Sequence, residues 1–283
     1  MTRLGLVLYV SAFLLASAST VFYFVPYYQF WVLVTNVGST EFYVAVLPVV
    51  YHALPRAAAM GLALSLLAAA TAAGLLKDIL KLPRPPEDLW RVRAEGYGFP
   101  SGHATGSTAF WGYLSIYRAS APLVAFSAVL IVSVSASRVI LGVHYPRDVL
   151  GGVLLGVVAA TLSYLAVRAL DSTRLAAAGA AVGVAGLALH YLGLGELEPP
   201  SALLGVAVGE LVCGRLGLTG RAGWRYGVLG SVLALAVGIP ALRLDHPIAS
   251  PALMALAGFL AVLAPRLAWS RLGGGGGKEG SSG

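Results

Sequence analysis

Two histidines and an aspartate occupy positions at which they could carry out nucleophilic and acid–base chemistry. Asp148 follows His144 by four residues at the predicted start of a helix. That spacing lets the carboxylate hold one imidazole nitrogen as a donor and leaves the other lone pair free to attack. His103 lies in the first turn of another predicted helix. Two such histidines can divide a transfer reaction, one attacking phosphorus and the other protonating the leaving oxygen.

Three cations and a helix start could bind the phosphate that such a reaction needs. Lys77 lies at the end of one predicted helix, Arg84 follows a proline-stiffened turn, and Arg138 ends another predicted helix. A planar guanidinium can bind two phosphate oxygens at once. Ser101 is a good N-cap, and Gly102 lets an anion approach the helix N-terminus closely. We expect these groups to neutralise the transferred phosphate, a role that metal ions play elsewhere.

The same residues form a pattern of three segments within residues 77–148. The pattern reads Lys, six residues, Arg-Pro; then Pro-Ser-Gly-His; then Ser-Arg, five residues, His, three residues, Asp. It resembles the signature of the type 2 phosphatidic acid phosphatase (PAP2) superfamily, and every fixed position is present in order and at the right spacing. Agreement over so many specified residues is far more specific than a single short motif.

The resemblance implies a role for each motif residue. His144 would be the nucleophile that forms a phosphohistidine, Asp148 would orient it, and His103 would be the acid for the leaving group. The phosphoryl oxygens would be bound by Lys77, Arg84, Ser101, Gly102 and Arg138. The family works without a metal ion or other cofactor. Its membrane members have a six-helix core with the site at the outer face.

The composition predicts an all-α polytopic membrane protein. Of the 283 residues, 58% are hydrophobic and 11% are charged, whereas soluble domains have about a quarter charged residues. Ten crossings are predicted, at about 4–25, 40–53, 57–77, 103–117, 121–138, 148–168, 175–192, 200–214, 226–242 and 249–266. The first six would form the core, and about four would be additional. The second is short and could be re-entrant, which would leave nine.

The distribution of arginine predicts the orientation. If the N-terminus lies inside, every second connection between helices is cytoplasmic. These cytoplasmic connections hold most of the arginines, as the positive-inside rule requires. This places the protein in the plasma membrane with its motif residues at the extracytoplasmic face. The polar loop 78–102 breaks the rule, because it puts cations on the outer side. Phosphate binding would explain why these cations lie on the outer side.

The chain is expected to divide into three regions. Residues 1–170 would be the PAP2-like catalytic core, and 171–272 would be additional transmembrane helices. Residues 273–283 are rich in glycine and serine and read as a flexible tail or a remnant of cloning. The formal net charge of +7 is attributed mainly to cytoplasmic loops, so membrane lipids and a lipid phosphate are the expected partners and nucleic acid is not.

A polyprenyl (dolichyl- or undecaprenyl-type) diphosphate is the preferred substrate, because an outward site could recycle carrier lipids. Phosphatidate, phosphatidylglycerophosphate and glucose 6-phosphate are the alternatives, and a phosphotransferase that passes the group to another lipid is a further one.

Two other features are interpreted from position alone. The aromatic stretch 27–31 is expected at the level of the lipid headgroups, and Glu41 and Glu210 are flagged because they lie within or beside apolar runs.

Overall fold

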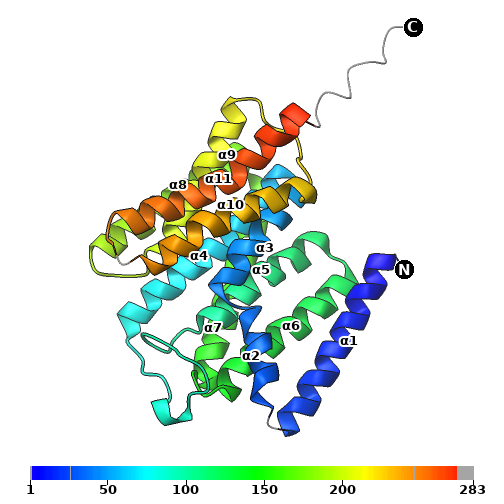
Figure 1. Cartoon of the computed structure of the whole chain (residues 1–283), viewed down its shortest axis with the longest axis vertical. Coiled ribbons are helices and arrows are strands. Elements are labelled where there is room, and N and C mark those ends of the chain that lie inside the picture. The colour runs from blue at the N-terminus through cyan, green and yellow to red at the C-terminus, as the bar shows by residue number, and fades with distance from the viewer. Residues whose placement is uncertain (1, 26, 245, 273–283) are drawn as a thin grey trace. The chain divides into compact units, whose positions relative to one another are not determined.

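The computed structural model describes residues 2–25, 27–244 and 246–272, and all the regular structure in these ranges is helical. The tail 273–283 lies outside the described residues. One short 3-10 helix, η1, covers Glu87–Leu89. The α-helices (Figure 1) are α1 (Arg3–Phe24), α2 (Tyr28–Asn36), α3 (Thr40–Ala53), α4 (Arg56–Leu80), α5 (Gly102–Arg118), α6 (Ala121–Ile140), α7 (Pro146–Ala169), α8 (Ser172–Tyr191), α9 (Glu198–Arg215), α10 (Trp224–Arg243) and α11 (Ala249–Leu272).

Most of these helices are long and apolar enough to cross a membrane. By length and composition seven of the described helices qualify, and α2 with α3 would make an eighth span, bent by 45° at the break between them. This is the polytopic helical fold that the composition predicts. The predicted nine or ten crossings also included α5 and α9. These two helices do not qualify as spans by length and composition, because α5 has only 17 residues and α9 carries three charged ones.

Contacts divide the chain into two compact units that share several helices. The first unit comprises 1–42, 64–165 and 188–196, and the second comprises 43–63, 166–187 and the chain from 197 onward. All eight predicted site residues belong to the first unit. The division into a catalytic core at 1–170 and additional helices at 171–272 stays a prediction.

Glycines on α7 allow this helix to pack closely against α5. A Cβ atom at Gly152 would lie 2.6 Å from the carbonyl oxygen of Ser101, and one at Gly156 would lie 2.8 Å from that of Thr105. Leucines on the other side of α7, including Leu154, are largely exposed. Small residues inside and large apolar residues outside are typical of helices packed in lipid.

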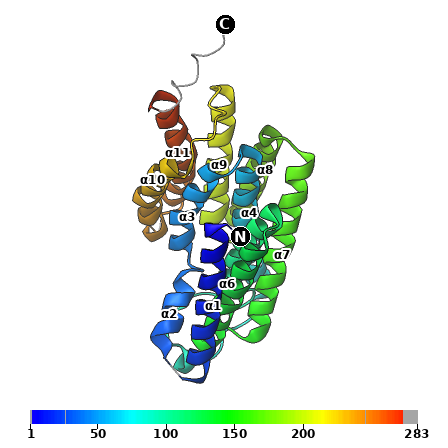
Figure 2. The ribbon, with the colours of Figure 1, turned by 90° about the vertical axis from the view of Figure 1, so that its right-hand side faces the viewer.

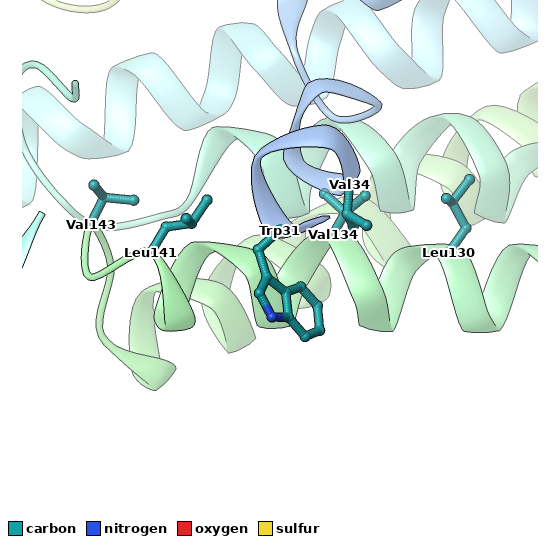
Figure 3. Close-up of a cluster of buried hydrophobic side chains, with 6 residues drawn as sticks. All are labelled: Trp31, Val34, Leu130, Val134, Leu141 and Val143. Carbon is teal, nitrogen blue, oxygen red and sulfur yellow. The ribbon is translucent and has the colours of Figure 1, made fainter. Parts of the chain in front are cut away.

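The break between α2 and α3 lets α2 pack against α6 (Figures 1 and 3). Figure 3 shows Trp31 beside the α6 residue Val134, and both side chains are buried. The Trp31 indole Nε1 donates to the carbonyl oxygen of Phe22, 3.2 Å away in α1. Trp31 of the aromatic stretch is thus buried against α6, whereas Tyr27 and Tyr28 are exposed, and the placement of this stretch at the level of the lipid headgroups stays a prediction. Helix α1 also lies beside α6 (Figures 1 and 2), where Ser19 and Ser133 share a hydrogen bond of 3.0 Å.

A buried ion cluster holds helices of the second unit together. The Glu210 carboxylate of α9 lies 2.6 Å from Arg56 Nε and 2.8 Å from Arg266 Nη2 of α11, and it accepts a 2.7 Å hydrogen bond from the Tyr51 hydroxyl. Arg266 lies within α11 and is buried. This network explains why a carboxylate, Glu210, occurs within an apolar run of the sequence.

Gly156→Leu is expected to destabilise the first unit, because the new side chain has no room against α5. Overpacking of this kind costs about 1–3 kcal/mol, and more where backbone atoms line the contact. Thermal unfolding of the purified protein in detergent measures the loss. Val158→Leu, which enlarges an exposed residue of the same helix, is the matched control. Equal melting temperatures for the two variants would contradict the close α5–α7 contact.

Glu210→Ala is expected to destabilise the second unit strongly, because it leaves two guanidinium groups without their shared carboxylate. Removing one partner of a buried ion pair costs about 3–5 kcal/mol. The melting temperature in detergent again provides the measurement, with Glu198→Ala in the first turn of the same helix as the control. A Glu210→Ala protein as stable as the control would show that the cluster does not hold the helices.

Candidate functional site

The turn after α6 brings His144 back over the end of that helix. Gly142 has a φ of 75°, a left-handed conformation that commonly ends a helix and that glycine adopts without steric cost. The backbone amides of Val143 and His144 then donate to the carbonyl oxygen of Arg138, each at 3.2 Å. The same turn therefore holds the predicted nucleophile beside a predicted phosphate-binding arginine.

The two nitrogens of His144 face groups of opposite charge. Nδ1 lies 3.6 Å from Asp148 Oδ2, while Nε2 lies 2.8 Å from Nη1 of Arg84. A guanidinium can only donate, so Nε2 is the acceptor and Nδ1 carries the proton toward Asp148. The expected orienting carboxylate is in place, but at a distance longer than a hydrogen bond. Asp148 Oδ2 instead accepts a 2.9 Å bond from the backbone amide of Tyr145.

The start of α5 is tied to the start of α7. The Ser101 amide donates to the carbonyl oxygen of Asp148 at 2.9 Å, and the first bond within α5 runs from Thr105 N to Ser101 O. The amides of the first turn therefore have no partner within the helix. Ser101 is the N-cap residue by position, as predicted, but its side chain makes no capping bond. A Cβ atom at Gly102 would lie 3.9 Å from Lys77 Nζ, which places this ammonium beside the helix start.

The two site arginines are held differently. Arg84 donates to the backbone carbonyl oxygens of Val143 (2.9 Å), Glu95 (2.9 Å) and Gly96 (3.1 Å), so most of its donors serve the loop around it. Arg138 uses Nη1 to donate to Thr35 Oγ1 at 2.8 Å. Its Nε is buried and makes no hydrogen bond. Arg138 is therefore the arginine with donors free for a ligand.

The cations around His144 favour its neutral form. Burial is the largest cause, and Arg84, Arg138, His103 and Lys77 add to it, so the pKa of His144 falls to about 2. A neutral imidazole has the lone pair that a nucleophile needs. Burial also lowers the pKa of Arg84, against the opposing charges of Asp148 and Glu196.

Several buried polar atoms of the site make no hydrogen bond among the described residues. They are Ser101 Oγ, Arg138 Nε, His144 Nδ1 and Asp148 Oδ1. Unsatisfied buried groups are costly and uncommon in folded proteins. Of these atoms, Ser101 Oγ and Arg138 Nε can donate to a phosphoryl oxygen.

His103 is half-buried beside the break between α2 and α3. A Cβ atom at Gly38 would lie 3.2 Å from His103 Cδ2, so this glycine allows the helix break to approach the ring. Sequence reasoning missed two neighbours of the site. Thr35 supports Arg138, and Glu196 lies 2.7 Å from Lys77 Nζ. Neither belongs to the motif, and no spacing in the sequence pointed to them.

Within the described residues of the chain, no three histidine, cysteine, aspartate or glutamate side chains gather closely enough to hold a metal ion. The expectation of a metal-free reaction stays a prediction, and it is tested by experiment below.

Comparison with known proteins gives a family for the segment that contains the site. Residues 58–171 match the family model described as PAP2 superfamily. Two curated relatives, from two strains of Mycobacterium tuberculosis, are both described as decaprenylphosphoryl-5-phosphoribose phosphatase. Each is 35% identical over 85 residues, which is 29% of this chain and 46% of the relative. The chain thus spans about half the length of the curated relatives it matches.

No solved structure shows a significant match to this chain. The matched segment contains the whole three-segment motif, with its lysine, arginines, histidines and aspartate arranged as described above. Residues 58–171 are therefore similar to the PAP2 superfamily, both in the match to its family model and in the motif.

Proposed function

We propose that this protein removes phosphate from a lipid phosphate or diphosphate through a phosphohistidine on His144. The observation that carries the proposal is the pair of contacts made by the imidazole. Nε2 faces the cationic side of the site and Nδ1 faces Asp148. A neutral ring held between a carboxylate and phosphate-binding cations is arranged for attack on phosphorus.

In the first step, the lone pair of His144 Nε2 forms a bond to phosphorus as the ester oxygen leaves. Arg84 must first give up its contact with Nε2, and its Nη1 group can then turn to the phosphoryl oxygens. Asp148 stabilises the positive charge that develops on the ring. Arg138, Lys77 and the first amides of α5 neutralise the transferred group, and His103 gives a proton to the leaving oxygen.

In the second step, water takes the place of the leaving group. His103, which has lost its proton, accepts one from the attacking water. The new oxygen bonds to phosphorus, the bond to His144 Nε2 breaks, and inorganic phosphate is released. The imidazole is then neutral again, and Arg84 can return to it.

A polyprenyl diphosphate is the preferred substrate. The curated relatives act, by their printed name, on a decaprenylphosphoryl compound, which is also a polyprenyl-linked phosphate. Their name also favours a second candidate, a phosphosugar carried on a polyprenyl phosphate. Phosphatidate, phosphatidylglycerophosphate, glucose 6-phosphate and transfer to a lipid acceptor remain the alternatives.

We place the protein in the plasma membrane with the site at the extracytoplasmic face. The arginine-rich loops on the opposite side support this orientation, because short basic loops are retained in the cytoplasm. An outward site would meet carrier lipids where they are released. Residues 171–272 are assigned to additional transmembrane helices.

His144→Ala is expected to reduce phosphate release by about a thousandfold or more, because no other group stands in its place as nucleophile. The rate is measured with a polyprenyl diphosphate in detergent micelles. Binding of inorganic phosphate by calorimetry and an unchanged melting temperature are the controls for folding. Turnover within about tenfold of the unmutated protein would contradict the role of His144.

Phosphate release is expected to persist in excess EDTA, because lysine, arginine and backbone amides supply the positive charge. The purified protein is tested with polyprenyl diphosphate, phosphatidate, phosphatidylglycerophosphate and glucose 6-phosphate, and polyprenyl diphosphate should give the largest kcat/KM. A loss of activity in EDTA that added Mg²⁺ restores would contradict the metal-free mechanism. A preference for glucose 6-phosphate would contradict the lipid substrate.

A further inference from the structure

A carboxylate from beyond the matched family segment lies on one of the proposed phosphate-binding cations. Glu196 follows α8, and its Oε1 is 2.7 Å from Lys77 Nζ. The Lys77 side chain is 18% exposed and that of Glu196 is 46% exposed. The ammonium that should meet phosphate is therefore paired with a carboxylate that the PAP2 motif does not include.

The loop that carries Glu196 is fixed against the end of α4. The Gly195 amide donates to Asp78 Oδ2 at 2.7 Å, and the Gly195 carbonyl oxygen accepts from His190 Nδ1 at 2.8 Å. A Cβ atom at Gly74 would lie 2.9 Å from the Glu196 backbone nitrogen, so this approach requires a glycine in α4. These contacts hold the backbone of Glu196 against α4, the helix that carries Lys77.

Glu196 also acts on the wider cationic site. The negative charge of Glu196 raises the pKa of Arg84, as the charge of Asp148 also does. Lys77 Nζ in turn lies beside Gly102 at the start of α5. A carboxylate bound to Lys77 therefore stands at the edge of the space in which the phosphoryl group must be held.

Carboxylate and phosphate oxygens are alternative acceptors for the same ammonium donors. We propose that Glu196 competes with phosphoryl groups for Lys77 and thereby weakens the binding of phosphate at this site. A phosphoryl group must draw Lys77 away from Glu196 or share it. When inorganic phosphate leaves, Glu196 takes Lys77 back, which favours release of the product. This inference rests on the proposed function, since it assigns Lys77 to phosphate binding.

Glu196→Gln tests the competition with little change of shape. Inorganic phosphate is titrated into the purified full-length protein by calorimetry, and its Ki as a product inhibitor is measured in the phosphatase assay. Both Kd and Ki are expected to fall about three- to tenfold, because a partly exposed ion pair contributes a modest free energy. Glu87→Gln removes an equal charge from an exposed position in η1 and should change neither constant by more than about twofold.

Gly74→Ala provides an independent variant, because it displaces the Glu196 loop without changing any charge. It should lower the Kd for phosphate in the same direction. An unchanged Kd in both variants would overturn the proposal. Weaker phosphate binding in Glu196→Gln would also overturn it, since Glu196 would then be positioning Lys77 for phosphate.

The calorimetric measurement separates this proposal from the proposed function. If the unmutated protein binds phosphate but hydrolyses none of the lipid phosphates, the proposed function fails while the effect of Glu196 on Kd can still be read. If turnover is observed but Glu196→Gln changes neither the Kd nor the Ki for phosphate, the proposed function stands and the competition of Glu196 for Lys77 is contradicted.

Discussion

Repulsion among the cations around His144 is the constraint on which the rest of this site depends. Lys77, Arg84 and Arg138 all act on the same imidazole. With no phosphate bound, such a group can persist only if other segments of the chain hold its members in place. Arg84 is held by backbone carbonyl oxygens, Arg138 by Thr35, and Lys77 by Glu196. Each cation thus has a support of a different kind.

The helices of the first unit supply these supports through close contacts. Glycines on α7 bring this helix onto α5, and the Ser101 amide reaches the carbonyl oxygen of Asp148. The broken pair α2–α3 places Thr35 under Arg138 and Gly38 beside His103. The site is therefore assembled at helix ends, where free amides and sharp turns are available. The long apolar stretches of the same helices are left to face lipid.

The difference in how the cations are held has a consequence for the reaction. Arg84 already uses most of its donors on the loop, and its contact with His144 Nε2 covers the atom that we propose attacks phosphorus. Arg138 has a buried Nε with no hydrogen bond. Arrival of a phosphoryl group would satisfy Arg138 and draw Arg84 off the nucleophile. Substrate binding and exposure of the nucleophile would then be the same event.

Two local features of the motif segments could be predicted from the sequence because they depend on neighbouring residues alone. The four-residue step from His144 to Asp148 and the helix start at Ser101–Gly102 are set by neighbouring residues, and the structure has both. The all-helical membrane fold followed from composition and is likewise confirmed.

Other features could not be predicted because they depend on distant pairing. Glu196 meets Lys77 across 119 positions, and Glu210 meets Arg56 across 154. No periodicity links such residues before the helices are packed. The packing of Trp31 against α6 could not be predicted either, because it depends on how two separate helices meet.

The central claim is that His144 becomes covalently phosphorylated. The most direct test is to stop the reaction of a radiolabelled polyprenyl diphosphate with alkali and to map the labelled peptide by mass spectrometry. The expected result is a phosphate on His144 that is stable in alkali and lost in acid, and that is absent from His144→Ala. A phosphate found on another residue, or turnover with no phosphoenzyme under conditions that trap one in a known phosphohistidine enzyme, would contradict it.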